Sequence, residues 1–267
     1  MQDPLQHFLI VTPLALLALW FYARLARGVL RGETSQLPWI PFRPGDTIFV
    51  SILSLFFIIN LIKAGESSGS QTLTPDAVLY AIIYYLVLIV FILGFLWFRN
   101  LNPLEVFGFR NSGWPRKGFF ALGCLLAVYP MIALAQLISY TFFTKGAAPQ
   151  QVVSFLVGSE ASSYSRTLII LLAIVVAPIA EELIFRGYLY GVFRKFAGRL
   201  PAILFCSILF AAIHLHLPSM FALIILAIAL TLVYERTGSL WAPILMHATF
   251  NALSVLAATY WPELLSQ

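Results

Sequence analysis

The 267-residue sequence predicts an all-α fold, a polytopic membrane helix bundle with about eight transmembrane helices around a polar intramembrane cavity. The first observation is composition: 61% of the residues are apolar, 10% are charged and the mean hydropathy is +0.92, which is far outside the range of soluble domains. The second is a series of apolar stretches close to the roughly 20 residues that a helix needs to cross the hydrocarbon. The third is a set of ionisable side chains inside the later stretches.

Eight stretches qualify as membrane spans, because a helix satisfies all of its backbone polar groups internally. Several of the later stretches are short enough to need close protein neighbours. In chain order the eight are 7–23, 47–62, 77–98, 119–143, 167 to about 193, 201–217, 219–234 and 240–260.

The basic residues predict the orientation, since Lys and Arg in short loops stay on the cytoplasmic side. They gather in alternate loops: Arg24, Arg27, Arg31 and Arg43; Arg99, Arg110, Arg116 and Lys117; Arg194, Lys195 and Arg199; and Arg236. The opposite loops hold only Lys63, Lys145 and Arg166. We therefore expect a multi-pass protein of a bacterial inner membrane with both termini outside and a retained first span. The net charge of +5 comes mostly from these anchors and calls for the lipid bilayer, not nucleic acid, as partner.

The segment "APIAEELIFRGYLYGVFRK" places two acids and an arginine inside an apolar stretch, where an unpaired charge costs a few kcal/mol. Glu182 and Arg186 are four residues apart, so a helix pairs them on one face. Glu181 points about 100° away and needs another partner across the bundle. It could serve as a base for water, or both acids could belong to an ion-pair network that only joins helices. Pro178 should kink the helix and free a carbonyl.

Two further clusters follow. In "FAAIH", Phe210 and His214 are four residues apart and should stack, with His214 buried; in "HATFN", His247 and Asn251 are one helical turn apart and could aim donors at one point. Alone, each pattern is more typical of hydrogen-bonded contacts between helices. Together with Glu181 they provide a base, an acid and oxyanion donors, as peptide hydrolysis by water requires.

Other reactive groups offer less. Cys124 and Cys206 lie in apolar stretches and are interpreted as small core residues. No serine, cysteine or aspartate stands in a comparable setting, so the sequence does not indicate a covalent nucleophile.

The three patterns resemble the EExxxR, FxxxH and HxxxN motifs of the CPBP family of intramembrane proteases. This family includes the type II CaaX prenyl endopeptidases and the bacterial Abi relatives linked to bacteriocin processing or self-immunity. The resemblance covers roughly 166–260, the expected catalytic core, whereas 1–165 supplies about four further spans of the same integral membrane unit. It implies a cavity that opens toward the cytoplasm, Glu181 as the base, His214 as its partner, and His247 and Asn251 as oxyanion donors.

In that scheme Glu182, Arg186 and Phe210 are supporting residues, and the expected function is an endopeptidase acting on a membrane-associated protein or peptide. A non-catalytic immunity or interaction protein and a proton-coupled transporter stay open as alternatives, although no inverted repeat favours the transporter. We expect no cofactor. Zinc bound by Glu181, His214 and His247 is the alternative, but HExxH is missing and Asn251 is a poor zinc ligand.

Overall fold

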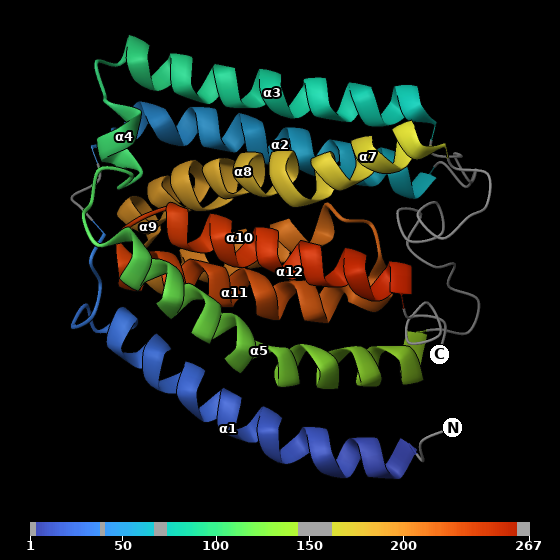
Figure 1. Ribbon diagram of the computed structural model, residues 1–267. Coiled ribbons are helices and arrows are strands. Elements are labelled where there is room, and N and C mark those ends of the chain that lie inside the picture. The colour runs from blue at the N-terminus through green and yellow to red at the C-terminus, as the bar shows by residue number, and fades with distance from the viewer. Residues whose placement is uncertain (1–3, 38–40, 67–73, 144–161, 261–267) are drawn as a thin grey trace.

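The computed structural model describes residues 4–37, 41–66, 74–143 and 162–260. Within these ranges the chain forms helices joined by turns, and no strand occurs (Figure 1). The first half contains α1 (Pro4–Leu30), α2 (Pro44–Glu66), α3 (Pro75–Phe98), the short α4 (Pro103–Val106) and α5 (Trp114–Phe143). The second half contains α7 (Ser163–Leu171), α8 (Ala177–Glu182), α9 (Tyr190–Ala197), α10 (Arg199–Ala212), α11 (Met220–Thr237) and α12 (Trp241–Tyr260).

All eight predicted spans coincide with helices, which confirms the helical membrane bundle. Six helices of the described chain are long and apolar enough to cross a membrane: 10–30, 75–98, 114–139, 163–197, 217–237 and 241–260. The apolar parts of α2 and α10, Pro44–Asn60 and Arg199–Ala212, are shorter. The start of α1 and the end of α12 lie at the same end of the bundle (Figure 1).

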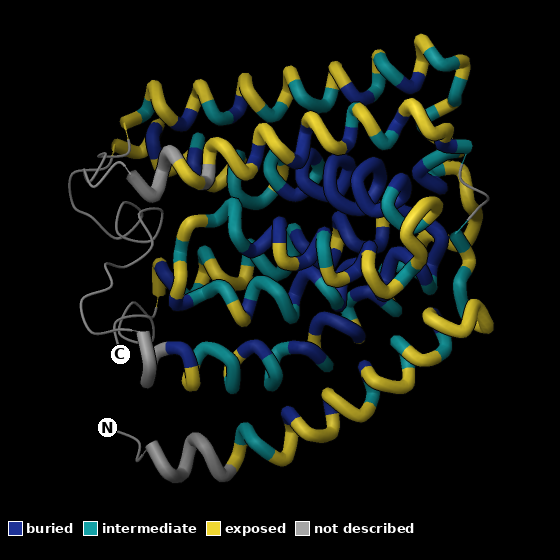
Figure 2. The backbone as a smooth tube through the Cα atoms, turned by 180° about the vertical axis from the view of Figure 1, so that it is seen from behind, coloured by how far each residue is buried: buried dark blue, intermediate teal, exposed yellow. Residues whose placement is uncertain are grey.

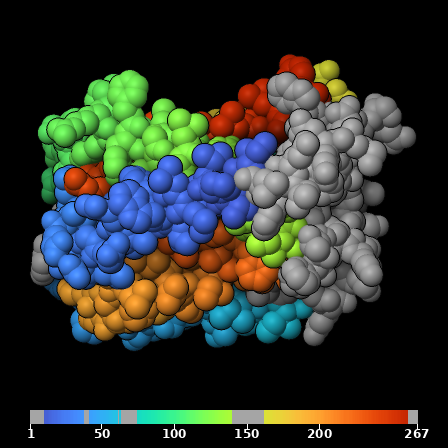
Figure 3. Space-filling view, turned by 90° about the horizontal axis from the view of Figure 1, so that it is seen from below, coloured from blue at the N-terminus to red at the C-terminus, as the bar shows by residue number. Residues whose placement is uncertain are grey.

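The centre of the bundle is formed by the second half of the chain. Helix α11 packs against α5, α10 and α12, and α3 covers α7 and α8 from the other side. Seen from below, α1 crosses the molecule on the surface of α5 and α11 (Figure 3). The buried residues lie mainly in the central helices, whereas the outer helices expose apolar side chains (Figure 2). Such faces suit a hydrocarbon solvent.

Two π-helical segments interrupt the long helix from Ser163 to Ala197. They are η1 (Leu172–Val176) and η2 (Leu183–Leu189), and they flank α8, which carries the paired acids. All seven residues of η2 are buried. Because π-helical turns widen a helix and are frequent at functional sites, they mark this stretch as special.

The predicted span 201–217 extends too far, because α10 ends at Ala212. The last carbonyls of this helix are satisfied by the turn that follows: the backbone N–H of Ile213 donates to Leu209 and that of His214 to Ala211. The ring Nδ1 of His214 lies 2.7 Å from the Phe210 carbonyl. A basic side chain at a helix C-terminus that bonds a free carbonyl ends the helix there.

Candidate active site

Glu181 lies at the wall of a cavity, and no Lys or Arg side chain of the described chain forms an ion pair with it. The residue is only 5% exposed, and its Oε1 accepts a 2.7 Å hydrogen bond from the hydroxyl of Tyr85 on α3. Its Oε2 lies 3.8 Å from Nε2 of His247 on α12, which is too long for a hydrogen bond. The expected partner across the bundle is therefore a neutral phenol, with one imidazole close by.

Glu182 is neutralised, in contrast to Glu181. Its Oε1 accepts a 2.8 Å hydrogen bond from Nη1 of Arg186, which confirms the ion pair predicted from their spacing. The same oxygen lies 2.9 Å from Nδ1 of His247. All three side chains are at most 3% exposed. Because a carboxylate only accepts, Nδ1 of His247 carries a proton and Nε2 is the ring atom that faces Glu181.

The ring of Phe210 contacts the arginine and both histidines. The guanidinium carbon of Arg186 stands 4.5 Å from the centroid of the Phe210 ring, a cation–π contact in a buried setting. The ring of His214 contacts Phe210 at 4.8 Å between centroids, but the two planes are tilted by 52°, so the predicted contact forms without parallel stacking. The ring of His247 meets Phe210 edge-on at 5.7 Å. Arg186 also donates to the Ala227 carbonyl at 3.2 Å. This aromatic ring fixes the relative positions of the charged and imidazole groups.

His214 is half-buried, not fully buried as the sequence suggested, because it lies in the turn beyond α10. Its Nδ1 donates to the carbonyl of Phe210, since a carbonyl can only accept. This contact is the structural role expected of a single histidine in a membrane helix. It also fixes the tautomer of the neutral ring, so that the lone pair at Nε2 is left for other chemistry.

Asn251 donates from Nδ2 to the carbonyl of Ala173 at 2.8 Å. Ala173 lies in η1, where Ala177 N–H bonds to the Leu172 carbonyl five residues earlier. In that register the next donor would be residue 178, but Pro178 has no N–H. The proline frees a carbonyl, as predicted, and Asn251 satisfies it. One amide hydrogen of Asn251 is thereby used, and its Nδ2 carries a second.

The structure thus gathers the predicted residues into one region without joining them all directly. Glu181, Glu182, Arg186, Phe210 and His247 form a continuous set of contacts. His214 joins this set through Phe210. The donors of His247 and Asn251, expected at a single point, go to Glu182 and to a backbone carbonyl in the described chain.

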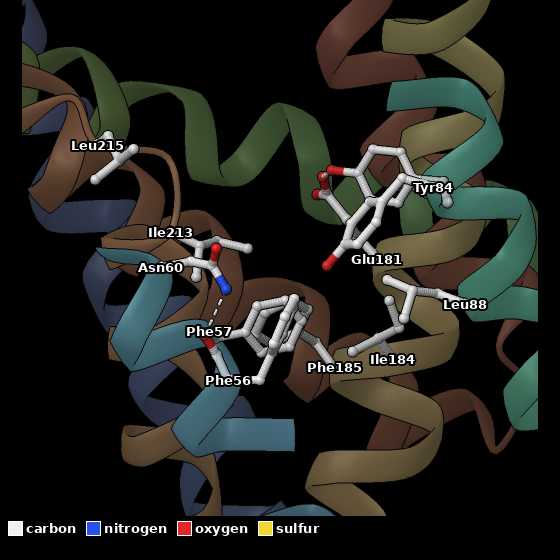
Figure 4. Close-up of a pocket in the computed structure, with 11 residues that line it drawn as sticks. Phe56, Phe57, Asn60, Tyr84, Leu88, Glu181, Ile184, Phe185, Ile213 and Leu215 are labelled. Atoms are coloured by element: carbon white, nitrogen blue, oxygen red, sulfur yellow. Dashed lines mark hydrogen bonds between the residues drawn. The ribbon is translucent and has the colours of Figure 1, made fainter. Parts of the chain in front are cut away.

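A cavity of about 300 Å³ borders Glu181 (Figure 4). Its walls come from α2, α3, the α8–η2 segment and the turn after α10. The lining residues are Phe56, Phe57, Asn60, Tyr84, Tyr85, Leu88, Glu181, Ile184, Phe185, Ile213 and Leu215. Sequence reasoning did not find Tyr85 and Asn60. The available indication was a polar group within the otherwise apolar stretches 77–98 and 47–62, which is weak for a tyrosine because its ring is largely apolar.

Zinc bound by Glu181, His214 and His247 is the alternative that the sequence leaves open. Among the residues that the structure describes, no three His, Cys, Asp or Glu side chains converge as metal ligands. A catalytic zinc requires three protein ligands aimed at one centre.

Together, the fold and this site define a polytopic helical membrane protein with a carboxylate and two imidazoles grouped at membrane depth. Residues 163–253 match the family described as Type II CAAX prenyl endopeptidase Rce1-like. This segment contains all seven residues of the three motifs. It confirms the resemblance to the CPBP protease family for this part of the chain.

Two curated proteins are similar over the same part. The chain is 29% identical over 89 residues to "Putative membrane peptidase YdiL" of Bacillus subtilis (strain 168), covering 33% of this chain and 36% of that protein. It is 34% identical over 93 residues to "UPF0177 protein YbdJ" of Lactococcus lactis subsp. lactis (strain IL1403), covering 34% and 38%. The similarity thus spans little more than a third of either relative. No solved structure matches.

The buried ion pair generates a prediction about stability. We expect Arg186→Met to lower the free energy of unfolding by about 3–5 kcal/mol, because it leaves Glu182 charged and buried without its cation. The double variant Glu182→Gln with Arg186→Met should recover much of that loss. Thermal unfolding in detergent measures both. Arg110→Met, which breaks the exposed pair with Glu105, is the matched control and should cost at most about 1 kcal/mol.

Strictly additive effects of the two single substitutions would contradict the coupling of Glu182 and Arg186.

Proposed function

We propose that the protein is an intramembrane endopeptidase that hydrolyses a peptide bond of a membrane-associated protein or peptide with a glutamate-activated water. The observation that carries this proposal is the asymmetry of the paired acids. Glu182 is bonded to Arg186, whereas Glu181 is held by the neutral Tyr85 at the wall of a cavity. A network that only joins helices needs one neutralised carboxylate, not a second one beside a cavity.

In the proposed reaction, Glu181 takes a proton from water while the water oxygen bonds to the substrate carbonyl carbon. The carbonyl oxygen becomes an oxyanion, which accepts hydrogen bonds from Nε2 of His247 and from the second amide hydrogen of Asn251. Donation from His247 requires a ring protonated on both nitrogens, with Glu182 accepting from Nδ1. Glu181 then passes the proton that it took from water to the lone pair at Nε2 of His214. The carbon–nitrogen bond breaks as His214 gives the same proton to the leaving amine, which leaves Glu181 ionised and His214 neutral, as at the start.

The depth of the site supports a membrane-embedded substrate. Glu181, Tyr85 and His214 all lie about 20 Å along their helices from the ends that carry the basic loops, at ~1.5 Å per residue. With those loops in the cytoplasm, as the basic residues favour, the cavity lies well inside the hydrocarbon layer of about 30 Å. A bond cleaved there belongs to a segment that enters the membrane.

We expect Glu181→Gln to lower cleavage of a panel of single-span membrane peptides by about 10²–10⁴-fold, because the amide cannot accept the proton of water. Purified variants are assayed by mass spectrometry of the products beside thermal unfolding. Glu105→Gln removes an exposed carboxylate and should change neither.

The same panel separates the alternatives. A cleaving Glu181→Gln variant would end the proposed mechanism. Uncleaved peptides together with pH-dependent flux into liposomes would instead indicate a transporter, and a full phenotype of Glu181→Gln in cells would indicate an interaction protein.

Tyr85→Phe removes the hydrogen bond to Glu181 and keeps the ring. We expect kcat to fall about 10- to 100-fold with KM within a factor of two, since a hydrogen bond to a charged group is worth about 1.5–3 kcal/mol. Tyr84→Phe, in the neighbouring residue that also lines the cavity, is the matched control. Equal effects of both substitutions on kcat would argue against a specific role for the Tyr85 hydroxyl.

We further propose that the site acts without a metal ion, because no three His, Cys, Asp or Glu side chains of the described chain converge on one point. Cleavage should therefore persist after dialysis against a chelator. Activity lost on chelation and restored by added zinc would refute this.

A further inference from the structure

The cavity beside Glu181 is mainly apolar, and its polar groups belong to Glu181, Asn60 and two tyrosines. Phenyl rings and aliphatic chains form most of its lining, and Glu181 is the one ionisable carboxylate among the described lining residues. In Figure 4, Phe56, Phe57 and Phe185 lie together at one side, and Glu181 and Tyr84 lie at another. An apolar cavity holds water poorly and favours an apolar occupant.

Asn60 of α2 adds one polar group to this lining, away from Glu181 in Figure 4. Its Nδ2 donates to the Phe56 carbonyl at 2.8 Å, so its Oδ1 is the atom that can accept a hydrogen bond from a ligand. A cavity with an apolar body and few polar groups is typical of a site that binds an apolar group and orients the chain attached to it.

We propose that this cavity is the substrate subsite that receives a large apolar side chain, such as Leu, Ile, Met or Phe, next to the bond that is cleaved. The inference rests on the proposed function, because Glu181 then activates water at the edge of the subsite. A cavity of about 150 Å³ already holds a benzene ring. The 300 Å³ here accommodates a large side chain with part of its backbone.

The occupant comes from a segment within the membrane. Phe56 and Leu215 line the cavity and are 43% and 55% exposed, so they form a rim on the lipid side of the bundle. On the side nearer the basic ends, Phe49 of α2 stacks on Phe95 of α3 and packs at a tilt against Phe91. We therefore place the opening toward lipid, in contrast to the cytoplasmic opening that the resemblance implies.

The proposed catalytic residues and most of the residues that line the cavity come from different parts of the chain. The proposed catalytic residues lie within 163–253, the segment that matches the protease family. Six of the lining side chains come from α2 and α3, which precede that segment: Phe56, Phe57, Asn60, Tyr84, Tyr85 and Leu88. Substrate choice is set by the first half of the chain.

The test varies the size of the substrate side chain and, separately, the size of two side chains that line the cavity. Wild-type protein should cleave single-span peptides with Leu or Phe at the position next to the cleaved bond at least tenfold faster in kcat/KM than those with Ala, Lys or Asp there. Phe56→Ala should shift the preference toward Trp, and Leu88→Trp should shift it toward Ala, each by about tenfold or more. Leu55→Ala and Val87→Trp, at adjacent positions 56% and 60% exposed to lipid, are matched controls and should leave the preference unchanged.

If Phe56→Ala and Leu88→Trp leave the substrate preference unchanged while Glu181→Gln is inactive, the proposed subsite is wrong and the proposed function still holds. Stronger cleavage of a farnesylated cysteine than of Leu at this position would assign the cavity to an isoprenoid and would also overturn the proposal.

A binding measurement makes the test independent of turnover. A single-span Leu/Ala peptide carrying one benzoylphenylalanine is irradiated with the full-length Glu181→Gln variant, and the linked residues are mapped by mass spectrometry. Crosslinks within 56–60 or 84–88 support the cavity as the site that binds the apolar side chain. If these crosslinks form but the wild-type protein cleaves no peptide, the proposed endopeptidase function is contradicted and the binding site is not. Crosslinks elsewhere overturn the subsite.

Discussion

The site depends on the unequal treatment of two adjacent carboxylates. Glu181 and Glu182 follow one another on α8, so the helix turns them to different neighbours. Arg186 and His247 both bond to Glu182, and the positive charge is thereby used. Two buried acids with one guanidinium leave one carboxylate without a full counter-ion, and Tyr85 holds that carboxylate in place. The cost of keeping it at membrane depth is the physical reason to assign it a chemical role.

Two other buried acids of the described chain, Asp46 and Glu235, differ from Glu181 because each is paired with an arginine. Asp46 is paired with Arg99 at 2.5 Å and also accepts from the backbone of Arg43, and Glu235 is paired with Arg194 at 2.5 Å. Both are fully buried and lie near the basic loops, where they join loops to helix ends. Their charges are neutralised, so they behave as structural ion pairs.

Irregular backbone makes the site possible. A regular helix would satisfy the Ala173 carbonyl internally, but the π-helical η1 and Pro178 leave it to Asn251. The turn after α10 likewise leaves the Phe210 carbonyl to His214. Leu215, the next residue, has a positive φ of 53°, an unusual conformation for leucine at the cavity wall. Non-helical backbone at this depth is tolerated because protein and the cavity surround it.

Much of the fold and part of the site could be predicted from the sequence. The eight apolar stretches located the helices, since hydrocarbon demands internally bonded segments. Local spacing predicted the Glu182–Arg186 pair and the contact between Phe210 and His214, because the members of each pair are one helical turn apart. Even the freed carbonyl followed from Pro178, which lacks an N–H whatever its surroundings.

Only the tertiary structure decided which groups meet across the bundle. Tyr85 reaches Glu181 from a helix almost a hundred residues away, and His247 bonds to Glu182, the acid already paired with arginine. The apolar cavity could not be foreseen, because its walls are ordinary membrane residues that become a site only when α2, α3 and the turn after α10 come together. A sequence fixes contacts one helical turn apart, whereas contacts between helices depend on how side chains of all helices pack.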